Sequence, residues 1–303
     1  MAHNAVVSGT SAQAAPDGVR RVEGFFEPAA AVRLYHCEWW PEPYPVARAG
    51  SAAGTIVVLM HGFAEHCRRY DELAEALLQQ GLAVCRIDAR GHGRSSGQRG
   101  DVASYDDYVY DLCAYVDRVA ALAPGRPIAL LGHSNGALIA IRALQRGLAR
   151  VSSVVLTNPY LQLRAARKPL PDALARLLAW GAGRLPLPNG LRPSDLTHDL
   201  SLQEAVRRDP WVLRVATPRW YWAAQLAGCD ALAEASKLAL PLLLILSDAD
   251  PIAEARASRT FYERVAAADK QLVLRAGELH EVLNEVDRQS LFALIADWLA
   301  RRN

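Results

Sequence analysis

A serine lies between two glycines in Gly132-His133-Ser134-Asn135-Gly136, which matches the pattern G-x-S-x-G. Where this pattern is functional, a strand turns sharply into a helix and exposes the serine hydroxyl as a nucleophile. A second match places Ser95 in a loop rich in Gly and Arg, with no helical stretch directly after it. Ser134 has an apolar run before it and a helical run after it, so we predict that Ser134 is the nucleophile and that Ser95 is a solvated loop serine.

A serine hydroxyl needs an adjacent base, and the base needs a third group to orient it. For this type of turn, the chain order is serine, then an acid, then a histidine. His280 follows an apolar run near the end of the chain and is the predicted base, whereas His198 is assigned a surface or packing role. Asp250 is the predicted acid, and the nearby Asp248 is interpreted as a turn or cap residue.

Two backbone N–H groups are expected to stabilise the negative charge that develops on the reacting oxygen. Asn135 directly follows the nucleophile and begins a helix, whose free N–H groups point at the site. Phe63 lies in the loop after the first strongly β-branched run and is predicted to supply the second N–H. His61, in the same loop, is interpreted as a buried histidine that shapes the loop, with a general base as the alternative.

The elements that must position these residues alternate short apolar runs with helical stretches. Continuous apolar strands separated by helices are typical of a parallel sheet covered on both faces. The opening stretch, residues 22–40, alternates instead and predicts an antiparallel hairpin at the sheet edge. Strands are predicted at residues 55–60, 82–87, 128–131, 151–156, 240–246 and 271–275, and helices at residues 70–80, 105–122, 135–146, 253–267 and 287–301.

The chain divides into a leader, a core and an insertion. Residues 1–20 are polar and are predicted to be a disordered leader, and residues 21–159 and 224–303 form the predicted core. Residues 160–223 contain several prolines and helical fragments but no clear strand. Because so long an unstructured loop is improbable in a compact domain, we predict a helical cap insertion over the carboxyl ends of the strands, where such sheets bind ligands.

The composition is that of an ordinary globular protein with a core large enough to enclose a site, because 51% of the 303 residues are hydrophobic and the net charge is +2. A charge so close to balance, without a basic block, argues against nucleic acid as a partner. None of the five cysteines lies in a C-x-x-C pair, which predicts free thiols and a reducing, cytoplasmic location. Neither a signal peptide nor a spanning apolar stretch is visible.

Four segments together resemble the monoacylglycerol lipase and lysophospholipase-like group of α/β-hydrolases, which is also described as serine aminopeptidase-like. They are residues 61–70, 88–97, 132–136 and 279–285, and the resemblance extends over residues 34–299. It implies an α/β-hydrolase fold, a mostly parallel doubly wound sheet with a helical cap insertion. It also implies a serine carboxylesterase that acts on single-chain lipid esters without a cofactor. Residues 88–97 match a loop of this group, which explains the second G-x-S-x-G pattern.

The sequence departs from the group at positions that affect the substrate. Asn135 stands where monoacylglycerol lipases usually carry Met, and Ser247 stands where Gly is common before the acid. The same chemistry could serve an aminopeptidase, an amidase or an acyltransferase, although no acidic group that would hold a substrate amine is identifiable near the cap. A non-catalytic receptor with this fold is disfavoured because all three of the predicted catalytic residues are present.

The cap insertion has two features that bear on the substrate. Residues 172–180 have the spacing of a short amphipathic helix, and Trp211, Trp220, Tyr221 and Trp222 form an aromatic group. These residues could line an apolar tunnel for the acyl chain and make transient contact with a membrane surface. They could equally serve to pack the cap on the core, and both interpretations stay open. The oligomeric state stays open as well.

Overall fold

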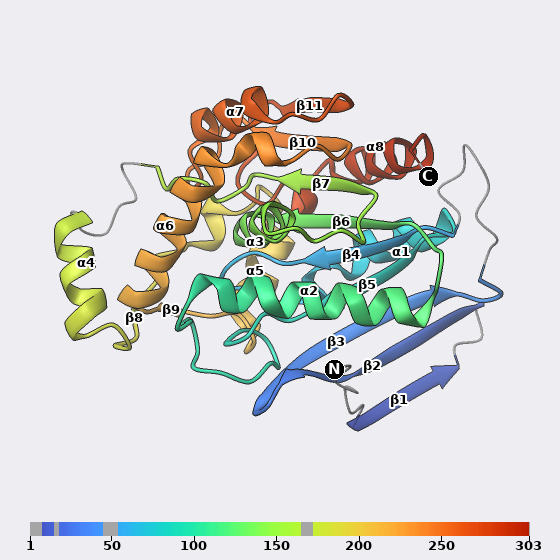
Figure 1. The fold of residues 1–303 in the computed structure, drawn as a ribbon, viewed down its shortest axis with the longest axis horizontal. Helices are drawn as coiled ribbons and strands as arrows, with labels where there is room; N and C mark the ends of the chain where they lie inside the picture. The colour runs from blue at the N-terminus through green and yellow to red at the C-terminus, as the bar shows by residue number, and fades with distance from the viewer. Residues whose placement is uncertain (1–7, 15–17, 45–53, 165–171, 303) are drawn as a thin grey trace.

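The computed structural model describes residues 8–14, 18–44, 54–164 and 172–302. Six parallel strands form the centre of its main sheet, and each predicted apolar run lies within one of them, give or take two residues at the ends. In spatial order they are β5 (Ala83–Ile87), β4 (Ile56–Met60), β6 (Ile128–His133), β7 (Ser153–Thr157), β10 (Leu242–Ser247) and β11 (Lys270–Arg275) (Figure 1).

Antiparallel strands extend the sheet beyond β5. The predicted hairpin consists of β2 (Val19–Ala29) and β3 (Val32–Pro41), and β3 pairs with β5. The prediction of a disordered leader over residues 1–20 was wrong in part, because residues Ser8–Ala14 form strand β1, which pairs antiparallel with β2. Without β1, the edge of β2 would present unpaired N–H and C=O groups, and a polar segment can satisfy them without any apolar pattern.

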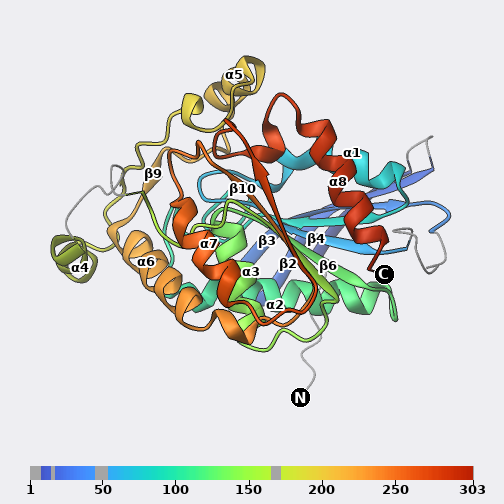
Figure 2. The same cartoon turned by 90° about the horizontal axis from the view of Figure 1, so that it is seen from above.

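Helices cover both faces of the sheet (Figure 2). Successive residues of β4 point to opposite faces: Val57 and Leu59 join one apolar cluster, and Val58 and Met60 join the other. This architecture confirms the predicted doubly wound α/β fold. On one face lie α1 (Asp71–Gln79) and α8 (Arg288–Ala300), and on the other lie α2 (Tyr105–Leu122), α3 (Asn135–Gln145) and α7 (Ala255–Arg264).

The segment between β7 and β10 lies at the carboxyl ends of the parallel strands (Figure 1). The proposed boundary after residue 223 falls inside α6 (Pro218–Ala233), which continues past it against α3 and α7. The segment also contains a ladder of two two-residue strands, too short to leave a period in the sequence. Its other elements are α4 (Asp172–Gly181), β8 (Leu187–Pro188), α5 (Leu200–Arg208) and β9 (Val215–Ala216).

None of the helices in the described part of the chain is both long and apolar enough to cross a bilayer.

Candidate active site

Ser134 lies at a strained turn between β6 and α3. Its φ of 52° and ψ of −116° are dihedral angles that residues other than glycine rarely adopt. The flanking glycines are needed for close approach, because a Cβ atom on Gly136 would lie 2.1 Å from the carbonyl oxygen of Met60. A Cβ atom on Gly132 would lie 2.7 Å from the Cα atom of Ala137. The motif therefore allows α3 to start directly against the sheet, with the serine at its tip.

The structure brings Ser134, His280 and Asp250 together from three different loops. The Nε2 atom of His280 lies 2.8 Å from Ser134 Oγ, and its Nδ1 atom lies 2.7 Å from Asp250 Oδ2. The other carboxylate oxygen of Asp250 accepts the N–H groups of Ile252 and Ala253 at 2.7 and 3.0 Å. With Asp250 as the acceptor, Nδ1 carries a proton and Nε2 presents a lone pair to the serine hydroxyl. All three side chains are buried.

Burial and neighbouring charge shift the pKa values of His280 and Asp250 in opposite directions. Burial alone would lower the pKa of His280, but the Asp250 carboxylate outweighs it and raises the pKa above the ordinary 6.5. Burial would raise the pKa of Asp250, but His280 and the two backbone N–H groups lower it. The ring of His133 lies 5.0 Å from that of His280, and burial together with His280 lowers its pKa to about 3. His133 therefore stays neutral and does not compete as a base.

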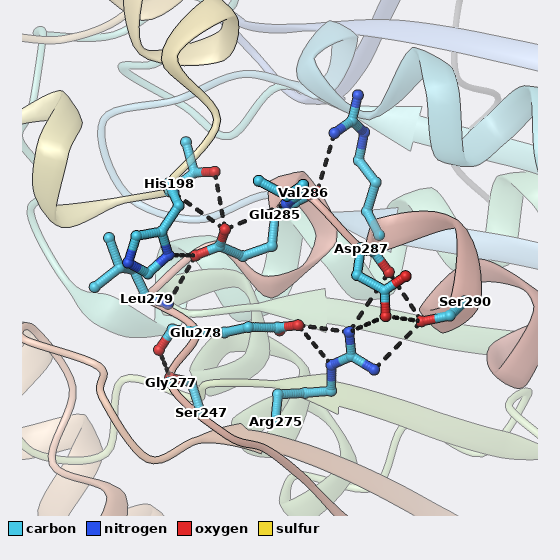
Figure 3. A network of polar contacts seen from close by, with 12 residues as sticks. His198, Ser247, Arg275, Gly277, Glu278, Leu279, Glu285, Val286, Asp287 and Ser290 are labelled. Atoms are coloured by element: carbon cyan, nitrogen blue, oxygen red, sulfur yellow. Dashed lines mark hydrogen bonds and ion pairs between the residues drawn. The ribbon is translucent and has the colours of Figure 1, made fainter.

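The loop that carries His280 is held by a buried carboxylate (Figure 3). Glu285 Oε1 accepts the N–H of Leu279 at 2.8 Å and lies 3.0 Å from Nδ1 of His198. Its second oxygen accepts the backbone N–H of His198 at 3.1 Å. His198, whose side chain is 54% exposed, thus connects the insertion to the loop before His280 through Glu285. Sequence reasoning did not assign a role to Glu285, although it closes the matched segment 279–285.

Asp248, the alternative acid, holds the turn before His280. Its Oδ1 atom accepts the N–H of Gly277 at 2.7 Å. The hydroxyl of Ser247 donates to the carbonyl of Glu278, and Arg275 binds the Glu278 carboxylate at 2.8 Å (Figure 3). Ser247 replaces a common glycine here with a side chain that adds a hydrogen bond to this turn.

The loop after β4 lies against the nucleophile. A Cβ atom on Gly62 would lie 3.1 Å from Ser134 Cβ. The residue before Phe63 is therefore in contact with the turn that carries Ser134 between β6 and α3, here called the elbow. His61 Nε2 accepts the N–H of Ala89 at 2.9 Å, and burial lowers the pKa of His61 to about 4. His61 is therefore a neutral, buried residue that joins two loops.

Asn135 begins α3 and is buried beside α2. The hydroxyl of Tyr105 donates to Asn135 Oδ1 at 2.8 Å. The asparagine that departs from the usual Met thus has a dedicated partner in the neighbouring helix. This contact fixes the side chain of the residue that directly follows the nucleophile.

A buried charged cluster that sequence reasoning missed lies beside the site. Arg69 binds Glu281 through two hydrogen bonds, at 2.8 and 2.7 Å. Glu65 Oε1 accepts the N–H of Gly62 at 2.5 Å and the hydroxyl of Tyr70 at 2.6 Å. Burial, and then the neighbouring Glu281 carboxylate, raise the pKa of Glu65 to about 7. The signal available in the sequence was the spacing of charged residues in segment 61–70 and the glutamate beside His280.

A cavity of about 460 Å³ opens on Ser134 and His280 beneath the insertion. The insertion contributes mostly apolar side chains to it, and the charged cluster lies at the core side. The apolar residues include Leu191, Leu196, Val206, Val212, Leu213, Trp220 and Tyr221. Such a cavity is suited to a ligand with one long apolar part and a polar end.

The aromatic group of the insertion is divided between different surroundings. Trp220 and Tyr221 are buried and line the cavity, so they serve both packing and the pocket wall. Trp222 instead lines a separate outer cavity with Trp180, and Trp211 is 41% exposed. Both interpretations left open for this group therefore apply to Trp220 and Tyr221, whereas Trp222 and Trp211 do not line the cavity at Ser134.

Comparisons with known proteins agree with this geometry. A profile of the family described as serine aminopeptidase, S33, matches residues 51–287. The chain is similar to a monoacylglycerol lipase of Mycolicibacterium smegmatis, with 30% identity over 280 residues that cover 92% of this chain and 97% of that protein. It is 31% identical to lysophospholipase L2 of Escherichia coli over 281 residues, covering 82% of this chain and 81% of that protein. The solved monoacylglycerol lipase of Paleococcus ferrophilus matches with a TM-score of 0.78 and 27% identity, covering 89% of this chain and 99% of that one.

Proposed function

The chain belongs to the serine aminopeptidase S33 family of α/β-hydrolases, and we propose that it hydrolyses single-chain carboxylic esters through an acyl-enzyme on Ser134. Monoacylglycerols and lysophospholipid-like esters are the proposed substrates. The observation that carries this proposal is the cavity beneath the insertion, which is mostly apolar and ends at Ser134. The names of the relatives, a monoacylglycerol lipase and a lysophospholipase, support the same substrate class.

In the first half of the reaction, Ser134 Oγ attacks the ester carbonyl carbon and His280 Nε2 takes the hydroxyl proton. Asp250 holds the imidazole in the required tautomer and stabilises the imidazolium. The N–H groups of Phe63 and Asn135 stabilise the oxyanion of the tetrahedral intermediate. When the intermediate collapses, the C–O bond to the alcohol breaks and His280 gives its proton to the leaving alcohol.

In the second half, water attacks the acyl-enzyme and His280 again accepts the proton. The second tetrahedral intermediate then releases the carboxylic acid, and the proton returns to Ser134 Oγ. The same two N–H groups stabilise both intermediates, so the cycle needs no further group.

The charged cluster favours an ester over a substrate with a free amine. Two acids line the cavity. Glu281 is neutralised by the two hydrogen bonds from Arg69, and burial together with Glu281 raises the pKa of Glu65 to about 7, which disfavours a second negative charge there. An aminopeptidase would instead present a carboxylate free to bind the substrate amine. A chain-length series of esters, compared with aminoacyl amides, tests this preference, and faster turnover of the amides would contradict it.

Replacing the nucleophile tests the proposal directly. Ser134→Ala is expected to reduce hydrolysis of p-nitrophenyl butyrate and octanoate by about 10⁴-fold or more, because the acyl-enzyme cannot form. The prediction that Ser95 is a solvated loop serine was wrong, because Ser95 is buried and its hydroxyl accepts the Tyr35 N–H at 2.9 Å and donates to the Asp88 carbonyl at 2.6 Å. Ser95→Ala, which changes this other G-x-S-x-G serine, is the matched control and should retain turnover. Activity that survives in Ser134→Ala would reject the assignment. Labelling of the unmodified protein by a fluorophosphonate probe excludes a non-catalytic receptor, for which no labelling is expected.

We also propose transient contact of the cap with membrane surfaces. On α4, Leu177 is 62% exposed and Trp180 is 89% exposed, and Leu185 nearby is 54% exposed. Apolar side chains this exposed can enter the interface of a bilayer. Trp180→Gln should reduce co-sedimentation with phosphatidylcholine vesicles, whereas Leu274→Gln, which changes an exposed residue of β11, should not. Equal binding of both variants would contradict the proposal.

The proposed location is the cytoplasm. Five cysteines are free thiols, and three of them, Cys37, Cys67 and Cys85, are buried. A reducing compartment maintains such thiols. Cell fractionation with a tagged chain tests this, and recovery in the periplasmic or extracellular fraction would contradict it.

A further inference from the structure

The side chain of Phe63 is in contact with the insertion as well as with the core. Its ring stacks on that of Trp220 in α6, with centroids 3.5 Å apart and planes at 25°. On the core side, the ring of His92 meets Phe63 edge-on at 5.1 Å. Phe63 is therefore held between the two parts of the molecule. The backbone N–H of this same residue is the proposed second donor to the oxyanion.

The loop that contains Phe63 has a backbone conformation that needs support. Ala64 has a φ of 70°, in the left-handed region that alanine rarely adopts. The Ala64 carbonyl accepts the N–H of Leu213 from the insertion at 2.8 Å. His66, two residues further on, lies 2.8 Å from the carboxylate of Asp209, also from the insertion. A strained loop persists only where its surroundings determine it, and here the insertion supplies several of those contacts.

Trp220 is itself well anchored. The Thr217 hydroxyl accepts the N–H of Trp220 at 3.1 Å and donates to Asp101 at 2.6 Å. The Thr217 N–H donates to the carbonyl of Gly100 at 3.0 Å, and Arg219 forms an ion pair with Asp101. The first turn of α6 is thereby joined to the core loop that ends at Asp101. The indole of Trp220 is a buried, fixed surface against which Phe63 packs.

We propose that Trp220 is a positioning residue for the oxyanion hole, because its indole holds the Phe63 ring and so places the Phe63 N–H. Helix α6 then determines the rate of attack at Ser134 as well as the shape of the pocket. An oxyanion donor acts only within hydrogen-bond distance of the developing charge, so a small displacement of the loop lowers the rate and leaves binding of the substrate largely intact. This inference rests on the proposed function.

A double-mutant cycle tests the coupling. Trp220→Leu and Phe63→Leu each remove the ring stack and keep an apolar side chain, and Trp220→Phe keeps a ring. Two assays are used. Steady-state turnover of p-nitrophenyl acetate, whose acyl group is too short to fill the cavity, gives kcat and KM, and labelling by a fluorophosphonate gives the rate of phosphonylation of Ser134. Trp222→Leu is the matched control, because Trp222 lies on the same helix but lines the outer cavity.

For Trp220→Leu we expect kcat and the phosphonylation rate to fall about tenfold, a fraction of the loss on removing an oxyanion donor, while KM changes less than about threefold. Trp220→Phe should recover most of the rate, and the control should stay within about twofold of the parent. The double variant should be no slower than the slower single variant, because both remove the same contact. Circular dichroism and thermal unfolding check the fold, and Trp220→Met replaces Trp220→Leu in the cycle if the latter does not fold.

Two results would overturn the inference. One is an unchanged kcat with a raised KM or an altered chain-length preference, which would make Trp220 a pocket wall only. The other is additivity of the two single substitutions in the cycle. A parent protein that is phosphonylated at Ser134 but turns over no ester would reject the proposed function, whereas the cycle on the phosphonylation rate would still decide the role of Trp220.

Discussion

His280 experiences two opposing influences, and their balance sets how the site responds to pH. Burial favours its neutral form, and the Asp250 carboxylate favours the cation strongly enough to raise the pKa above 6.5. Only the neutral imidazole can accept the proton of Ser134, so activity is lost as the pH falls through this pKa. The aspartate thus improves the base and at the same time moves its working range toward higher pH.

The first prediction concerns this acid. Asp250→Asn removes the charge that raises the His280 pKa, so the acidic limb of kcat/KM against pH should move to lower pH. We expect kcat to fall by about 10⁴-fold, because the amide no longer favours the productive tautomer. Asp248→Asn, which alters only the turn at Gly277, should keep the acidic limb of the parent. An unmoved limb in Asp250→Asn would show that Asp250 does not set this pKa.

A second residue-scale prediction concerns Asn135. Tyr105→Phe leaves the buried Asn135 Oδ1 without its 2.8 Å hydrogen bond and should lower the free energy of unfolding by about 1–3 kcal/mol. Tyr108→Phe on the same helix is the control, because the Tyr108 hydroxyl is buried and has no hydrogen-bond partner among the described residues. Urea unfolding measures both variants. Equal losses in the two would contradict a specific role for the Tyr105 contact.

At the scale of elements, the site depends on how closely α3 approaches the sheet. The nucleophile belongs to the turn from β6 to α3, and the loop after β4 reaches it from the neighbouring strand. Parallel strands bring their carboxyl ends to one edge, and β4, β6, β10 and β11 are the strands whose following loops carry the site residues. The spacing between these elements is set by backbone contact at Gly136 and Gly132.

The corresponding prediction is a substitution at the closest contact. Gly136→Ala places a methyl group 2.1 Å from the Met60 carbonyl oxygen, so α3 and β4 must separate. We expect a loss of about 1–3 kcal/mol in the free energy of unfolding together with a loss of esterase activity. Gly181→Ala, where nothing lies within 4 Å, should stay within about 1 kcal/mol of the parent. Retained activity in Gly136→Ala would mean that the elbow tolerates the wider spacing.

At the scale of the whole molecule, the insertion is joined to the core by buried charge and by apolar packing. Asp101 is buried in the core and binds both Thr217 and Arg219 at the start of α6. The same helix continues past the pocket to pack against α3 and α7. The insertion and core therefore share a helix as well as a cavity, which is why a boundary between them cuts through α6.

Removing this anchor should loosen the whole insertion. Asp101→Ala leaves Thr217 without its acceptor and the partly exposed Arg219 without its partner, and we expect a loss of about 1–3 kcal/mol in the free energy of unfolding. Asp230→Ala is the control, since its side chain is 61% exposed and lies 3.5 Å from Arg142, and it should cost less than about 1 kcal/mol. Chemical denaturation distinguishes them, and a similar cost for both would contradict the anchor.

The sequence alone determined the features whose cause is local. Apolar runs, helix periodicity and turn residues are properties of neighbouring positions, so the strands, the helices α2 and α3, and the choice of Ser134 over Ser95 could be predicted. The chain order of Asp250 and His280 after Ser134 followed from the same pattern. The fold class and the ester hydrolase family agree with that prediction.

Only the tertiary structure decided which distant residues support the site. Arg69 and Glu281 are 212 positions apart, and nothing at either position indicates the other. The contacts of Tyr105 with Asn135 and of Trp220 with Phe63 also join separate elements. Strand β1 has no apolar pattern in the sequence, and its place in the sheet is given by its antiparallel pairing with β2. These features depend on packing in three dimensions, whereas the elbow at Ser134 is encoded within a few consecutive residues.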